Sequence, residues 1–411
     1  MSPCKSLLAT ALLLAARSLA AAPIELERVI VEGQRIEPAP TPAEQIDGDE
    51  LRRARASTAD SAELLRNIPG LDLRAAGGTS SMPVIFGLGG DRVRTTVDGM
   101  DLIASCPNHM NPPLSYLDPG AIGQITVYAG ITPVSAGGDS IAGSIVAQTH
   151  APVFVNAGEA TDWSGEAGTS YRDNGGAWRA FVDAGIASDT FSAHYSGAHS
   201  ESDNYSAGGD FKTSTATGNN GRTLPLDEVA SSAYETNNHA LTLALRGREQ
   251  LLEARIGYQD TPFQGYPNQR MDMTDNRQQR INLRYLGELS FGTLEARAYH
   301  EDIEHRMDFG PDRRYWYGTN SGMGSPCAPI RFMGDPAGTC AAGMPMNSDS
   351  TTSGATLHLD LPLTGADLAR LGAEFMSYRL DDYWPASGGS MGPGIFTNIQ
   401  DGQRDRNSLF A

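Results

Sequence analysis

Hydrophobic and polar residues alternate along most of the chain after about residue 155. Alternation with a period of two places successive side chains on opposite faces of a β-strand. The pattern predicts about nine such strands, with a tenth beginning at NSLFA near the end of the sequence. The nine segments are WSGEAGTSYRD, AWRAFVDAGIA, TFSAHYSGAHSES, HALTLALRG, LLEARIGYQD, QRINLRYLGELS, GTLEARAYHEDIEHRMD, ATLHLDLPL and ARLGAEFMSYRL.

The connections between these segments are of two kinds. Some are tight turns, whereas three are long, polar and rich in glycine: residues 202–235, 259–277 and 308–352. Short turns at one end and long loops at the other are typical of an antiparallel transmembrane β-barrel. A soluble β-sandwich would explain the alternation but not the long loops on one side only. Aromatic residues near strand ends, which fit the interfacial girdles of a barrel, are Trp163, Tyr171, Trp178 and Tyr195.

The predicted barrel at residues 155–411 is unfinished. An incomplete sheet leaves an open edge, which lipid does not tolerate because backbone groups there stay unpaired. We therefore expect a partial β-barrel that is truncated at its C-terminal end.

Residues 46–154 differ in character from the alternating part. The stretch DSAELLRNIPGLDL places apolar residues at helical spacing before a Pro-Gly stop. Short strands follow, separated by Gly-rich turns. The pattern predicts a small α+β domain ahead of the barrel. The predicted strands of this domain are residues 84–86, 93–97, 125–128 and 144–147.

Residues 1–22 have the features of a secretory signal peptide. Lys5 supplies a positive charge, residues 7–16 form a short apolar stretch, and residues 18–22 offer small side chains for cleavage. No later segment has 18 or more uninterrupted apolar residues, as a spanning helix would need. The formal net charge of −18 argues against a nucleic-acid partner. The chain holds no nucleophile–base–acid set that would support an enzyme.

Residues 23–45 join a strand-like stretch to a Pro-rich linker. The sequence ERVIVE within it could add as an edge strand to the sheet of a partner protein. Its six residues are Glu27, Arg28, Val29, Ile30, Val31 and Glu32.

Three cysteines remain after the signal peptide. Cys327 and Cys340 lie in one loop rich in Pro and Gly, and export to an oxidising compartment favours a local disulfide between them. Cys106 is then left over. An odd cysteine in an exported protein is either a free reactive thiol or a ligand.

The predicted α+β domain resembles a known family over nearly its whole length. LLRNIPGLDL, PVIFGLGGDRVRTTVDGM and YLDPGAIGQITVYAGITPVSAGGDSIAGSIVAQT, in this order, are similar to the plug domain of TonB-dependent outer-membrane receptors. Phe86-Gly87 stands where that family usually has Arg-Gly. The resemblance implies a barrel of about 22 strands, of which this chain holds about the first half.

The same resemblance implies where the protein works and with which partners. It implies a protein of the outer membrane of Gram-negative cells, in contact with lipid, that imports a scarce ligand with energy delivered by TonB. Residues 27–32 stand where the TonB box of the family stands.

Four residues carry candidate metal chemistry. Cys106 and Met110 supply a thiol and a thioether from one loop of the predicted plug. His305 and Met307 are two apart on a predicted strand and can project together into the lumen. Sulfur ligands select Cu(I) over hard cations. The alternatives are that Met110 packs the loop and that His305 is a solvated residue at a strand end.

A narrower resemblance concerns the copper-receptor branch of the family. CPNHMNPP in the plug, with YPNQRMDMTDN and HRMDFG in the barrel, is similar to that branch. The resemblance implies transport of copper, bound as Cu(I), through one site shared by plug and barrel. The implied ligands are Cys106, Met110, His305 and Met307. Further candidates for capture of the ion are His109, Met271 and Met273.

Two other functions stay open. A ferric-siderophore or cobalamin receptor of the same fold would make Cys106 incidental. A non-transporting surface barrel would need no TonB box.

Overall fold

The computed structural model describes residues 43–411 with gaps at 56, 137, 139, 216, 218–221, 314–343, 364–366 and 387–393. Three predicted features lie outside the described residues: the signal peptide, the TonB-box segment and the disulfide between Cys327 and Cys340. Within the described ranges, no helix has the length and apolar character needed to cross a membrane.

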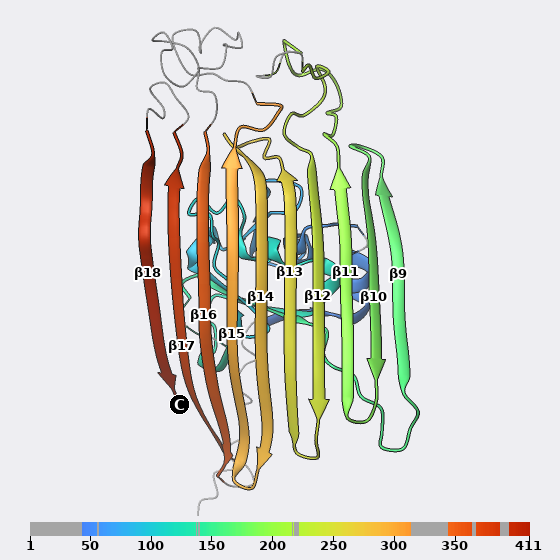
Figure 1. Cartoon of the computed structure of the whole chain (residues 1–411), viewed down its shortest axis with the longest axis vertical. Coiled ribbons are helices and arrows are strands. Elements are labelled where there is room, and N and C mark those ends of the chain that lie inside the picture. Colours follow the sequence, from blue (N-terminus) through green and yellow to red (C-terminus); the bar gives the residue numbers. More distant parts are fainter. Residues whose placement is uncertain are drawn as a thin grey trace, which may run out of the picture. The chain divides into compact units, whose positions relative to one another are not determined.

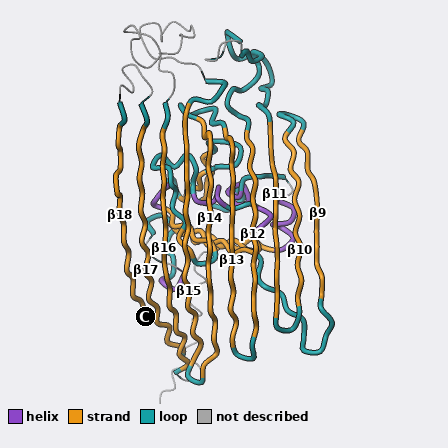
Figure 2. The backbone as a smooth tube through the Cα atoms, in the orientation of Figure 1, coloured by secondary structure: helices purple, strands orange, loops and turns teal. Residues whose placement is uncertain are grey.

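The alternating part of the chain forms one antiparallel sheet of ten strands, in which each strand pairs with its neighbours in sequence (Figure 1). Short turns such as residues 188–190 and 247–249 join strands at one end, and longer connections join them at the other (Figure 2). The strands are β9 (Asp162–Arg172), β10 (Ala177–Ala187), β11 (Phe191–Ser202), β12 (Tyr234–Arg246), β13 (Gln250–Gln264), β14 (Asp272–Leu289), β15 (Gly292–Asp308), β16 (Met346–Pro362), β17 (Leu368–Trp384) and β18 (Phe396–Phe410).

Several strands extend beyond the segments predicted from alternation. β14 and β16 begin inside stretches predicted as long loops, so the connection between β13 and β14 is only residues 265–271. The tenth strand begins at Phe396 and not at NSLFA. These boundary predictions were wrong because backbone pairing continues where both faces of a strand are polar, and hydrophobic alternation cannot reveal such strand ends.

The two faces of the sheet differ in burial with the period of two that strand geometry dictates. On β15, Tyr299, Ile303 and Met307 are buried, whereas His300 and Glu304 between them are exposed. The opposite, exposed face is rich in apolar side chains, as a lipid-facing wall requires. Examples of these exposed residues are Val182, Ile256, Ile281, Leu283, Leu357 and Phe375.

The described residues before β9 form two small sheets that lie against the buried face of the ten-stranded sheet. Their strand orders are β1-β7-β8-β5-β6 and β2-β3-β4. The strands are β1 (Ala43–Asp47), β2 (Leu71–Arg74), β3 (Met82–Ile85), β4 (Leu88–Gly89), β5 (Val93–Val97), β6 (Met100–Asp101), β7 (Ile122–Ala129) and β8 (Gly143–Thr149). The helices are α2 (Gly48–Arg55) and the 3-10 turns Ser61–Leu65, Gly90–Arg92, Pro113–Tyr116, Pro119–Ala121 and Val134–Ala136.

This small α+β unit has an apolar core of its own. The helix predicted in DSAELLRNIPGLDL is the short 3-10 helix Ser61–Leu65, and the Asp60 side chain caps it by accepting from the Ala62 N–H. Its core includes Leu65, Ile85, Val97, Leu114, Ile125 and Ile145.

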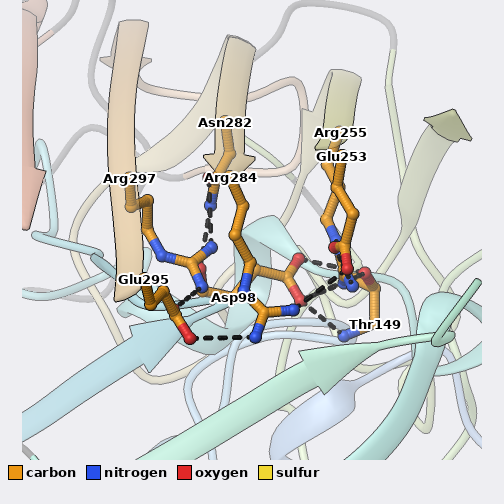
Figure 3. A network of polar contacts seen from close by, with 8 residues as sticks. All are labelled: Asp98, Thr149, Glu253, Arg255, Asn282, Arg284, Glu295 and Arg297. Atoms are coloured by element: carbon orange, nitrogen blue, oxygen red, sulfur yellow. Dashed lines mark hydrogen bonds and ion pairs between the residues drawn. The ribbon is translucent and has the colours of Figure 1, made fainter. Parts of the chain in front are cut away.

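A network of acidic and basic side chains joins the α+β unit to the wall formed by β13, β14 and β15 (Figure 3). Asp98, in the turn between β5 and β6, accepts from the Thr149 N–H at 2.9 Å and pairs with Arg255. The Asn282 side chain donates to the Asp98 carbonyl at 2.8 Å. Asp98 has a φ of 51°, a left-handed conformation that Asp and Asn tolerate better than most residues. The remaining members of the network are Glu253, Arg284, Glu295 and Arg297.

We expect the substitution Asp98→Asn to loosen the α+β unit. It keeps the left-handed turn and an acceptor for Thr149, but it leaves the half-buried Arg255 without one of its two carboxylates. The cost should be about 2 kcal/mol, measured by calorimetry in detergent. Asp360→Asn removes an exposed pair with Arg370 and should cost under about 1 kcal/mol. Equal effects would show that the buried network does not anchor the unit.

Candidate functional site

Sulfur-bearing side chains gather where the α+β unit meets strands β14, β15 and β16. They form a buried cluster distinct from the core of the α+β unit. We call it the sulfur cluster. Its buried members are Cys106, Met110, Tyr266, Met271, Met273, Met307 and Met346, and Ala76, Met344 and Trp384 pack against it while partly buried.

The loop after β6 supplies one side of the sulfur cluster. The Cys106 carbonyl accepts from the His109 N–H at 2.9 Å, which closes a tight turn. His109 lies in the left-handed region with a φ of 52°. The turn brings Met110 back beside Cys106, and Pro112 then leads into the 3-10 helix Pro113–Tyr116.

Cys106 is a free thiol that is fully buried. Burial raises its pKa to about 11, although the N–H groups of Met110 and Asn108 point at the sulfur and oppose the shift. Negative charge on Asp382 raises the pKa further. At neutral pH the thiol is therefore protonated.

The strands supply the other side of the sulfur cluster through their pairing register. Met273 on β14 is opposite Met307 on β15, and Met307 is opposite Met346 on β16. All three are almost completely buried, so their thioethers form one row on one face of the sheet. Tyr266, in the loop before β14, directs its hydroxyl toward the Met273 sulfur at 3.9 Å.

His305 lies on the same face of β15 as Met307, as the spacing predicts. It is fully buried. It lies two residues from Met307, in the next cross-strand row of side chains, between Asn276 on β14 and Ser348 on β16. Its Nδ1 is 3.1 Å from the Asn276 Oδ1. Its Nε2 is buried and has no hydrogen-bond partner among the described residues.

The structure thus brings most of the predicted site residues together. Cys106, Met110 and Met307, which are far apart in sequence, share one cluster, and the two candidate capture residues Met271 and Met273 belong to it. His305 lies in the adjoining row of side chains. His109 is turned away from the cluster, with its Nε2 3.9 Å from the Asp91 Oδ1.

Sequence reasoning missed two residues of the site, Tyr266 and Asn276. It places Met346 in the long loop 308–352, whereas Met346 begins strand β16. Tyr266 and Asn276 gave no sequence signal, because their placement depends on loop length and strand pairing.

The donors of the site are mainly soft. In the part of the chain that the structure describes, no three His, Cys, Asp or Glu side chains are placed to share a metal ion. The sulfur cluster instead offers thioethers and one thiol, with an imidazole in the next row. Such donors suit Cu(I) and disfavour Mg²⁺ and Ca²⁺. Complete burial would strip a bound ion of its water.

Iodoacetamide should alkylate Cys106 far more slowly in the folded than in the denatured protein at pH 8. The pKa of about 11 leaves little thiolate there, and the side chain is inaccessible. The stabilisation from the neutral thiol is complete below the ordinary pKa of 9.0 and disappears as the pH rises toward 11. Peptide mass spectrometry reads the modification, and equal rates in both states would contradict the buried position.

Comparison with known proteins identifies the fold. Residues 35–144 match the family described as "TonB-dependent Receptor Plug Domain". No curated protein matches the sequence. The match confirms the predicted plug domain.

Solved structures resemble the chain over plug and sheet together. One is "Copper transporter OprC", with 20% identity, a TM-score of 0.64, and coverage of 88% of this chain and 50% of that chain. Another is the FrpB iron transporter from Neisseria meningitidis, with 18% identity, a TM-score of 0.57, and coverage of 83% and 48%. A third is the ferric yersiniabactin uptake receptor FyuA from Yersinia pestis, with 13% identity, a TM-score of 0.54, and coverage of 89% and 60%.

The chain therefore spans about half the length of the solved structures that it resembles. Likeness at this level of identity defines the fold. The fold is a TonB-dependent receptor plug followed by part of an antiparallel barrel, as predicted.

Proposed function

We propose that this protein is an outer-membrane receptor that binds copper as Cu(I) and imports it with energy from TonB. The observation that supports this proposal is the sulfur cluster, in which Cys106 and Met110 of the plug meet Met307 of the barrel wall. The proposed ligands are Cys106, Met110, His305 and Met307. Met271, Met273 and Met346 surround them with further thioethers.

The chemistry of the proposed site favours the reduced ion. Thioethers and a thiolate stabilise Cu(I) and bind hard divalent ions poorly. A buried site also penalises charge, and a single thiolate would neutralise a monovalent ion. Capture of copper from an oxidised source would therefore require reduction before the ion reaches Cys106.

The division of ligands between two structural units suggests a release mechanism. Cys106 and Met110 move with the plug, whereas His305 and Met307 belong to the barrel wall. A displacement of the plug loop by a few ångströms would separate the two halves of the site and weaken binding of the ion. Force applied through TonB at residues 27–32 would supply that displacement.

The proposed function also assigns a role to each part of the chain. We assign residues 1–22 to a signal peptide, 23–45 to the TonB-box segment and its linker, 46–154 to the plug, and 155–411 to the partial barrel. The working location would be the outer membrane of a Gram-negative cell, with TonB and lipid as partners. Cys327 and Cys340 would form a disulfide.

Iron-siderophore uptake is the second candidate function, because receptors for iron and for ferric siderophores share the fold. That function gives the buried sulfur cluster no role beyond packing. Copper binding therefore discriminates between the two candidates. A non-transporting surface barrel is tested separately, through the TonB-box segment.

Removing single sulfur atoms should weaken copper binding. We expect Cys106→Ala and Met307→Leu each to lower Cu(I) affinity by at least about tenfold, since a lost ligand costs over about 1.4 kcal/mol. Competition with a chromogenic Cu(I) chelator measures the affinity. Met376→Leu is the matched control, because Met376 is equally buried on β17 but lies outside the sulfur cluster. Unchanged affinity in both site variants would overturn the copper site.

Deleting residues 27–32 should abolish copper uptake by cells and leave copper binding by the purified protein intact. The segment lies far along the chain from the proposed ligands, and its proposed role is to couple TonB to the plug. Uptake of copper at limiting concentration is compared between the deletion and a chain with the same residues scrambled. Full uptake without the segment would favour a barrel that is not energised.

A further inference from the structure

The orientation of His305 depends on a neighbour that the sulfur cluster does not include. His305 on β15 and Asn276 on β14 face each other directly across the two strands. Both side chains are fully buried. The His305 Nδ1 lies 3.1 Å from the Asn276 Oδ1, which is within hydrogen-bonding distance.

The orientation of the Asn276 amide decides which nitrogen of the ring carries the proton. The Asn276 Nδ2 has no hydrogen-bond partner among the described residues, and the reversed amide would place the ring proton on Nε2. In the observed orientation the Asn276 Oδ1 faces the ring, and a carboxamide oxygen can only accept, so the His305 Nδ1 donates. In the neutral ring the lone pair is then on Nε2. This Nε2 is buried and meets no hydrogen-bond partner among the described residues, so its lone pair is free to bind a metal ion.

A β-bulge sets Asn276 in this position. Met273 pairs with Met307, but the next pair is Asp275 with Arg306, and Asn276 then pairs with His305. Thr274 is the extra residue. If pairing continued regularly from Met273 and Met307, Thr274 would face Arg306 and Asp275 would face His305.

The bulge therefore keeps the Asp275 carboxylate from the position that faces His305. Asp275 lies instead near Arg277, with an oxygen 3.6 Å from the Arg277 guanidinium. Bulges re-aim side chains at functional sites. Here the bulge exchanges an acid for an amide beside a buried imidazole.

We propose that Asn276 is a positioning residue that holds His305 as its Nδ1–H tautomer and presents Nε2 to the transported ion. The identity of the ion rests on the proposed function, whereas the tautomer does not. Ligating histidines commonly donate their second ring N–H to a neighbouring acceptor, and loss of that acceptor lowers metal affinity by about 10–100-fold.

The tautomer can be measured in the protein without copper. The chain has 8 histidines, so ¹⁵N-histidine labelling gives few signals, and His305→Gln identifies the one from His305. The wild-type protein should show a protonated Nδ1 and an unprotonated Nε2. Asn276→Leu should lose this pattern, and Asn276→Asp should keep it because a carboxylate oxygen also accepts. A proton on Nε2 in the wild-type protein would overturn the proposal.

A second experiment measures how tightly the variants bind Cu(I). Asn276→Leu should lower Cu(I) affinity about 10–100-fold and remove the imidazole contribution to the X-ray absorption spectrum, while Asn276→Asp should keep both. Ser348→Ala is the matched control. It removes an equally buried polar group from the other side of His305, and Ser348 has no hydrogen bond to the ring among the described contacts.

The outcomes separate the two claims. Loss of affinity in Cys106→Ala but not in Asn276→Leu would refute the positioning role and leave the copper site intact. A wild-type protein that binds no Cu(I) would refute the proposed function, and the ¹⁵N spectra would still decide the tautomer. If Asn276→Leu fails to fold, loss of the imidazole signature in folded Asn276→Asp would contradict the role of the acceptor.

Discussion

The pairing register of β14, β15 and β16 is the constraint on which the site depends. Because side chains alternate between the faces of a strand, a slip of one residue would turn an entire set of side chains from the plug to the opposite face. The observed register aligns Met273, Met307 and Met346 in one row and places His305 in the next. Backbone hydrogen bonds, more than contacts between the sulfur atoms, therefore assemble the wall of the site.

The other half of the site depends on how the plug is held. The plug has its own apolar core, whereas its contacts with the wall include many charged groups. Besides the network around Asp98, Arg179 of β10 binds Asp118 with both of its terminal nitrogens, and Arg94 links Asp101 to Glu374 of β17. Such pairs orient two surfaces accurately but add little net stability beyond what water would give. A plug fastened in this way can shift without losing its core, which a ligand site divided between plug and wall requires.

Sequence patterns predicted the plug and most strands, and three of the four candidate ligands, Cys106, Met110 and Met307, share the sulfur cluster. They did not predict every neighbour of these residues. Alternation identified the apolar part of each strand, and the residue types of Cys106, Met110 and Met307 indicated soft-metal chemistry. The polar beginning of β16 concealed Met346, because no apolar face marks it as a strand. The role of Asn276 could not be predicted from the sequence, for a different reason. Its partner is fixed by the bulge at Thr274, and a sequence does not show where a ladder gains a residue.

A packed methionine cluster alone would be weak grounds for a binding site, because methionine is a flexible filler of irregular cores. The adjoining imidazole changes this balance. A core built for packing gains nothing from a buried His305 whose Nε2 finds no partner among the described residues, and an unsatisfied buried polar atom costs about 1–3 kcal/mol. Leucine at this position would pack without that cost. In the proposed copper site, a soft cation bound at Nε2 would supply the missing partner of this imidazole, whose Nδ1 lies 3.1 Å from the Asn276 Oδ1.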